Sequence, residues 1–116
     1  MEISDRYWKE IKKCAERRNI DFNLRREDAF DVFLQQERRC KFTNLPIDFT
    51  SMGHRGTASL DRLDNDKPYS KNNVQWVHSH INVMRGSHNI EYFLKMCTLV
   101  ASRQSSLYQS LLSEIA

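Results

Sequence analysis

Two oxygen-bearing side chains near the middle of the chain have the chemistry of a metal site. Asp61 lies in a segment with the composition of a β-strand, and Asn82 lies in a segment with helical character. A strand–loop–strand–helix unit can hold two such residues close together, and carboxylate and amide oxygens suit a hard ion such as Mg²⁺. His78 precedes Asn82 by four residues, which places both on one face of a helix that begins there. Because histidine exchanges a proton near neutral pH, the segment has the parts of a hydrolytic site.

The elements that must position these side chains form the central part of the chain. Residues 57–63 place Leu60 between polar neighbours, and residues 74–78 are rich in β-branched and aromatic side chains, which predicts two short strands. Residues 64–72 form a polar loop between them that is too long for a tight hairpin turn. A helix is expected to continue from the second strand and to stop at Gly86.

Helical segments flank this central part on both sides. Ser4 is expected to cap a first helix, which a break at residues 19–23 separates from a second helix that runs towards residue 39. Asn89 is expected to cap a C-terminal helical segment, in which a Ser-rich interval is compatible with a kink or with a break. The apolar stripes of the two N-terminal helices are interpreted as core packing.

Length, charge and cysteine content limit the class of protein. The 116 residues suffice for one small domain, and 18 Lys and Arg against 15 Asp and Glu give a net charge of +3, which permits a nucleic-acid partner without requiring one. No apolar segment opens the chain and no apolar run approaches about 20 residues, so an intracellular, cytoplasmic protein with no membrane partner is expected. Cys14, Cys40 and Cys97 form neither a disulfide framework nor a Cys-x-x-Cys pair.

The central motifs are SLDRLD at 59–64 and NVQWVHSHINVMR at 73–85. Together they resemble the HNH endonuclease family, in particular phage-type members with SLDRID, NVQWVH and IN-x-M(K/R) motifs. CKFTNLPI at 40–47 is similar to the segment that precedes the nuclease core in such proteins. The resemblance implies an α+β fold in a single domain, with a ββα-metal core of two short antiparallel strands and a helix at 40–86. N-terminal helices at 1–39 and C-terminal helices at 87–116 would flank this core.

The resemblance also implies roles for individual residues. The strand metal ligand of the family falls on Asp61, and its helix ligand falls on Asn82. The central Asn of the family falls on Asn73, where it would fix the loop and orient the catalytic base. The implied cofactor is a single divalent ion, Mg²⁺ first, with Mn²⁺ or others as alternatives. Without the resemblance, Asp61 and Arg62 would be interpreted as an ordinary surface ion pair.

The residue after Asp61 departs from the family. A His usually acts there as general base, but this chain has Arg62, whose guanidinium stays protonated and cannot readily accept a proton. Either Arg62 clamps phosphate while another group activates water, or the site is weakened. His78 is the first candidate for that group and His54 the second, and the alternative for His78 is a structural hydrogen bond at the end of the strand.

A second departure concerns zinc. Many family members hold a structural Zn²⁺ with two Cys-x-x-Cys pairs, whose positions fall here on Cys40 and Thr43 and on His78 and Ile81. Only two of the four positions keep a residue type that can bind zinc, so no structural zinc is expected.

The implied function is metal-dependent hydrolysis of DNA phosphodiester bonds. One site cuts one strand, so a monomer is expected to nick DNA with low intrinsic sequence specificity, and double-strand cleavage would need a homodimer or a partner protein. Arg55, Lys71 and Arg85 are the candidates for binding nucleic-acid phosphates around the site. Two alternatives stay open: a DNA-binding or interaction module on a weak or inactive HNH scaffold, and a nuclease that acts on RNA.

Overall fold

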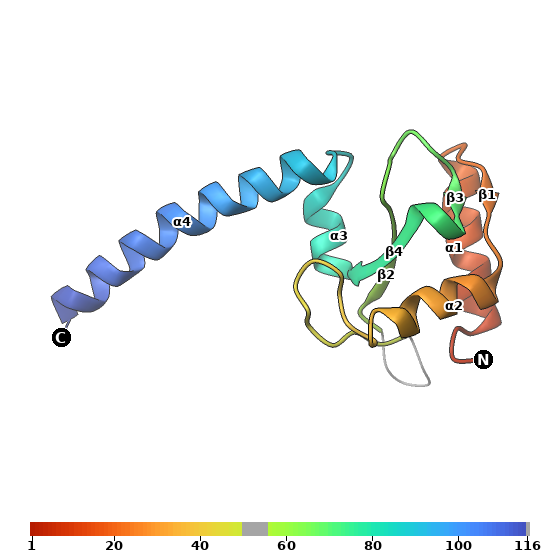
Figure 1. The fold of residues 1–116 in the computed structure, drawn as a ribbon, viewed down its shortest axis with the longest axis horizontal. Coiled ribbons are helices and arrows are strands. Elements are labelled where there is room, and N and C mark those ends of the chain that lie inside the picture. The colour runs from red at the N-terminus through yellow and green to blue at the C-terminus, as the bar shows by residue number, and fades with distance from the viewer. Residues whose placement is uncertain (50–55, 116) are drawn as a thin grey trace. The chain divides into compact units, whose positions relative to one another are not determined.

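The computed structural model describes residues 1–49 and 56–115, and within them the fold is α+β. Four α-helices and two sheets of two strands each make up the described part of the chain (Figure 1). The chain divides into two compact units, Met1–Gly86 and Ser87–Ala116. The elements of the first unit are α1 (Asp5–Arg17), β1 (Phe22–Asn23), α2 (Arg26–Gln35), β2 (Ala58–Arg62), β3 (Tyr69–Ser70), a 3₁₀ turn η1 (Lys71–Asn73), β4 (Val74–His78) and α3 (Ser79–Arg85).

The central feature of the first unit is an antiparallel pair of strands followed at once by a helix. β2 pairs with β4 in a register that sets Asp61 opposite Gln75 and Leu60 opposite Trp76. α3 begins at the residue after β4 and ends at Arg85, and the next residue is Gly86, whose φ of 57° favours glycine. The two predicted strands and the following helix are therefore confirmed.

One face of this strand pair is anchored in the apolar core. Trp76 is fully buried, and its ring packs edge-on against Phe33 of α2 and against Phe49. Its indole Nε1 donates a hydrogen bond of 2.8 Å to the carbonyl of Ala29 in α2. Because side chains alternate along a strand, Gln75 and its partner Asp61 face the other side, where α3 packs.

The edge of β4 is completed by a side chain in place of a third strand. The amide of Gln36, which follows α2, accepts a hydrogen bond from the backbone N–H of Trp76 and donates one to its carbonyl. The N–H of Lys41 also donates to that carbonyl. The C-terminal end of α2 and the following turn are thus fixed to β4.

α1 and a second small sheet support β2 and the loop that follows it. Ser4 caps α1 through a hydrogen bond from the N–H of Tyr7, as predicted. β1 pairs in parallel with β3, which the sequence did not predict, because strands of two residues are too short to show an alternating pattern. The hydroxyl of Tyr7 donates a 2.6 Å hydrogen bond to the carbonyl of Ala58, which links α1 to the start of β2.

The second unit contains one helix, α4 (Ile90–Ile115). Asn89 caps it, because its side-chain oxygen accepts a hydrogen bond from the N–H of Tyr92. The Ser-rich interval neither kinks nor breaks the helix into two elements, and the hydroxyl of Ser110 bonds back to the carbonyl of Ser106 four residues earlier. In the described residues no helix combines the length and the apolar character needed to cross a membrane.

The Tyr7–Ala58 contact predicts an alkaline loss of stability. Burial raises the pKa of Tyr7 to about 12 in the folded chain, whereas an unfolded tyrosine ionises near 10. The protonated hydroxyl of Tyr7 therefore contributes its full stabilisation below pH 10, and this contribution is lost as pH rises towards 12. We expect Tyr7→Phe to lower the free energy of unfolding by about 1 kcal/mol near neutral pH, through loss of the hydrogen bond. The free energy of unfolding of this variant should also decrease less above pH 10 than that of the wild type. Urea unfolding across this pH range would measure the difference.

The matched control is Tyr108→Phe, because Tyr108 is exposed on α4. This variant should keep the wild-type pH profile. Equal profiles for Tyr7→Phe and the wild type would contradict the assignment.

Candidate functional site

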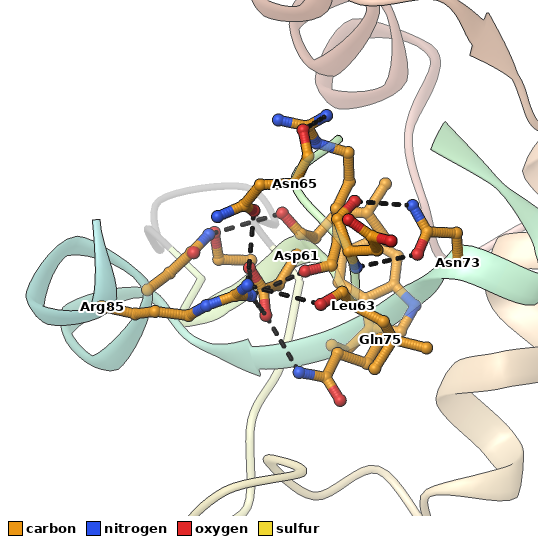
Figure 2. A network of polar contacts seen from close by, with 12 residues as sticks. Asp61, Leu63, Asn65, Asn73, Gln75 and Arg85 are labelled. Atoms are coloured by element: carbon orange, nitrogen blue, oxygen red, sulfur yellow. Dashed lines mark hydrogen bonds and ion pairs between the residues drawn. The ribbon is translucent and has the colours of Figure 1, made fainter. Parts of the chain in front are cut away.

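The site is organised by a buried ion pair between β2 and α3. Nη1 of Arg85 lies 2.7 Å from Oδ1 and 2.6 Å from Oδ2 of Asp61. The amide of Gln75, the cross-strand neighbour of Asp61, donates a further 2.9 Å hydrogen bond to Oδ2. Figure 2 shows the guanidinium of Arg85 directed at this carboxylate, with Gln75 reaching it from β4. Asp61 is 6% exposed and Arg85 is 0% exposed, so the pair is shielded from water.

Arg85 also fixes the end of β2. Its Nη1 donates a 2.6 Å hydrogen bond to the carbonyl of Arg62, and its Nη2 lies 3.3 Å from the side-chain oxygen of Asn65. Arg85 is the last residue of α3, so one side chain connects that helix to β2 and to the start of the loop. Removing one partner of such a buried pair leaves an uncompensated charge, which is strongly destabilising.

Asn82 lies on the same face as Asp61. Its Nδ2 donates a 2.7 Å hydrogen bond to the hydroxyl of Ser59 and a longer one of 3.4 Å to the carbonyl of Leu60. Ser59 and Asp61 are two residues apart on β2, and Asn82 and Arg85 are three apart on α3, so each pair shares a face. The structure therefore brings the two predicted metal ligands to one side of the strand pair.

Arg62 points away from this face and into the loop after β2. Its Nη1 donates hydrogen bonds of 2.7 Å to the carbonyl of Asn65 and 2.9 Å to that of Lys67. Its guanidinium carbon lies 5.3 Å from the ring centroid of Tyr69. Arg62 is only 7% exposed, so its guanidinium is used to hold the loop.

Asn73 holds the same loop from its other end. Its Oδ1 accepts a 2.9 Å hydrogen bond from the N–H of Asp64, and its Nδ2 donates 3.0 Å bonds to the carbonyls of Asp64 and Pro68. These contacts, visible at one end of the network in Figure 2, agree with the loop-fixing role that the sequence predicted for Asn73. These hydrogen bonds of the Asn73 side chain all go to the loop backbone, so the part of that role that concerns a base stays a prediction.

His78 sits at the junction of β4 and α3. Its Nδ1 accepts a 3.1 Å hydrogen bond from the N–H of His80, which makes it the N-cap of α3. A neutral imidazole that accepts at Nδ1 carries its proton at Nε2, where it is a donor. The structural hydrogen bond that was the alternative role for His78 is therefore present in the fold. In this tautomer His78 could accept a proton only at Nδ1, the nitrogen that caps the helix.

The positions of the family's zinc ligands also meet near β4. Burial raises the pKa of the Cys40 thiol, but hydrogen bonds from the Thr43 side chain and from the backbone of His78, Thr43 and Phe42 outweigh it and hold that pKa below its usual value. Thr43 and His78 occupy two of the other three ligand positions. Hydrogen-bond donors thus stabilise negative charge on the sulfur.

Of the predicted phosphate-binding residues, the two that the structure describes are each paired with a carboxylate. Arg85 is buried against Asp61, and Lys71 forms a 3.6 Å ion pair with Asp28 of α2. Arg55 and His54 lie outside the described residues.

A groove of about 700 Å³ lies beside Asn82. Its walls come from α1, β2 and α3, with Ser59, His80 and Asn82 on one side and, on the other, Glu10 of α1 and Arg18, the residue that follows α1. The sequence did not assign α1 to the site, because its polar residues lie outside the apolar stripe that was interpreted as packing. Asn82 is the predicted site residue that lines this groove.

The oxygens of Asp61 and Asn82 are compatible with a divalent ion, but the carboxylate of Asp61 is already paired with Arg85. Within residues 1–49 and 56–115 no three His, Cys, Asp or Glu side chains are grouped to hold a metal ion. Asp61 and Asn82 offer one carboxylate and one amide oxygen, which suit Mg²⁺. Both oxygens of Asp61 contact Arg85, so an ion would have to compete with the guanidinium for this carboxylate.

The Asp61–Arg85 contact was missed at the sequence level, although two signals could have found it. The antiparallel register sets Gln75 opposite Asp61, and the spacing of three residues places Arg85 on the face of α3 that carries Asn82. Arg85 was instead predicted to face phosphate.

The ion pair predicts a strong energetic coupling. We expect Asp61→Asn and Arg85→Gln each to lower the free energy of unfolding by about 3–5 kcal/mol, because each leaves a buried charge unpaired. The double variant should lose clearly less than the sum of the two, and urea unfolding of all four proteins would measure the difference. The exposed Lys71–Asp28 pair is the control, with an expected coupling below about 1 kcal/mol. Additive losses for Asp61 and Arg85 would contradict the structure.

Comparison with known proteins gives no match: no protein-family model, no curated protein and no solved structure matches the chain. The functional argument therefore depends on the motifs and on the geometry described above.

Proposed function

We propose that the chain is a metal-dependent DNA endonuclease of the HNH type, with β2, β4 and α3 as a ββα-metal core. The observation that carries this proposal is the position of Asp61 and Asn82 on one face of the strand–strand–helix unit. The motifs that resemble the HNH family imply the metal ligands at these same two residues.

In the proposed site each residue has a separate role. Asp61 supplies one negative charge and Asn82 a neutral oxygen, which leaves a bound divalent ion net positive towards phosphate. When bound, Mg²⁺ would stabilise the charge that develops on the phosphate and on the leaving oxygen. The groove lined by Asn82 offers room for the substrate next to this proposed ligand. Asn73 keeps the loop between the strands in place.

His78 and His80 are the two candidates for the proton acceptor. His78 can act only by giving up its bond to the N–H of His80, at a cost to the cap of α3. His80 itself lines the groove together with Asn82, so the two imidazoles are compared directly in the test below.

A second candidate function is nucleic-acid binding without cleavage. Two observations favour it: Arg85 contacts both oxygens of Asp61, and the guanidinium of Arg62 is bound to loop carbonyls at the position where the family has its base. A nuclease that prefers RNA is the third candidate, which the choice of substrate separates from the first.

The proposed enzyme acts on intracellular DNA and nicks one strand as a monomer. Cutting both strands would require two copies or a partner protein, because one core holds one site.

The test is a plasmid-nicking assay on chelated protein with Mg²⁺ or Mn²⁺ added back. We expect conversion of supercoiled to open-circular DNA only with metal, and a loss of at least about 100-fold in rate for Asn82→Ala. Met84→Ala is the matched control, because Met84 is exposed on α3 and does not line the groove. Of His78→Gln and His80→Gln, the one that removes the proton acceptor should lose about 10²–10⁴-fold.

The alternatives give different results in the same experiment. A gel shift of the plasmid without nicking under either metal would favour the binding module, and faster cleavage of RNA of matched sequence would favour the ribonuclease. Equal nicking by Asn82→Ala and wild type would exclude Asn82 as a ligand.

A further inference from the structure

We propose that Arg85 is a built-in cation that competes with the divalent metal ion for Asp61 and so sets the metal affinity of the site. The inference rests on the proposed function, because it assumes that Asp61 is the metal-binding carboxylate. It goes beyond that function by assigning to Arg85 control over metal loading, in place of the phosphate contact predicted from the sequence.

The first argument is the position of the guanidinium nitrogen. Nη1 of Arg85 is almost equidistant from the two oxygens of Asp61, at 2.7 and 2.6 Å. This is a chelating position, in which one positive group bridges both carboxylate oxygens. Because Mg²⁺ binds carboxylate oxygen at about 2.0–2.1 Å, it cannot share the same side of the carboxylate with Nη1.

The second argument is charge. Arg85 already neutralises the single negative charge of Asp61, and Gln75 uses a further lone pair of Oδ2. Two cations on one carboxylate in a partly desolvated site repel each other, so an ion elsewhere on this carboxylate would also be disfavoured while Arg85 stays. Metal binding at Asp61 and the Asp61–Arg85 ion pair therefore compete with each other.

The third argument is what the guanidinium holds besides Asp61. Its bonds to the carbonyl of Arg62 and to Asn65 would be lost when a metal ion displaced it. Metal binding would then loosen the end of β2 and the start of the loop from α3. Arg85 is the last residue of α3 and is followed by Gly86, which marks the end of the first unit, so the displaced side chain lies at a terminus of that unit.

The experiment compares variants that keep or remove the charge at position 85. Mn²⁺ binding is measured by electron paramagnetic resonance, which counts free Mn²⁺ and needs no activity. We expect Arg85→Gln to bind Mn²⁺ at least about tenfold more tightly than the wild type, because the competing charge is gone. Arg85→Lys keeps a competing cation and should stay close to the wild-type affinity.

Two controls place the effect at Asp61. The double variant Asp61→Asn with Arg85→Gln should lose the tight binding. Arg62→Gln removes the neighbouring buried guanidinium, which contacts loop carbonyls, and should leave Mn²⁺ affinity unchanged. Circular dichroism checks that each variant is folded.

A measurement on the wild type decides the question if Arg85→Gln does not fold. The guanidinium N–H signals of Arg85, assigned by their absence in Arg85→Lys, should be slowly exchanging without metal and should be lost as Mg²⁺ is added. Signals that persist at the highest Mg²⁺ concentration would overturn the proposal, as would equal Mn²⁺ affinity in folded Arg85→Gln and wild type.

The Mn²⁺-binding experiment and the nicking assay can fail independently of each other. Tighter, Asp61-dependent Mn²⁺ binding in a protein that never nicks DNA would support the role of Arg85 and refute the nuclease. Metal-dependent nicking by a protein whose Mn²⁺ affinity is the same with and without Arg85 would support the nuclease and refute the role of Arg85.

Discussion

The buried pair of Asp61 and Arg85 is the constraint on which the functional face depends. A two-stranded sheet is marginal by itself, and α3 has seven residues, too few to be stable without tertiary contacts. The apolar face of the strand pair is secured by Trp76 against α2. On the opposite face Val77 is also fully buried, and there the ion pair joins β2 to the last residue of α3. Asn82 is held near Ser59 because the helix that carries it is fixed at its end.

The same network extends into the loop between the strands. Arg62 is the last residue of β2 and Asn73 the last residue of η1, and their side chains satisfy backbone groups at Asp64, Asn65, Lys67 and Pro68. Backbone groups of a loop otherwise need water or regular structure as partners. The loop therefore has a defined conformation, and the short β1–β3 pairing fixes its far end next to α1.

The sequence predicts those features that have a local cause. The strand at 74–78, the caps Ser4 and Asn89 and the stop at Gly86 follow from residue types and spacing, and the structure confirms them. The direction of long side chains has no such cause. Arg85 was predicted to bind phosphate, and a phosphate clamp was one of two alternatives for Arg62, but each finds acceptors inside the fold that come from other elements. The two-residue strands, and the participation of α1 in the groove, likewise depend on tertiary contacts.

This placement of the arginines changes the electrostatics expected of the proposed enzyme. Two of the cations nearest to the site are buried, and one of them cancels the charge of Asp61, so the metal-free face offers little net charge to DNA. A carboxylate needed for chemistry would be a buried, uncompensated charge in the absence of metal, which is strongly destabilising. An internal guanidinium removes that penalty at the expense of metal affinity. Stability without the ion and readiness to bind it are therefore opposed at Asp61, and Arg85 is the residue through which the balance between them is set.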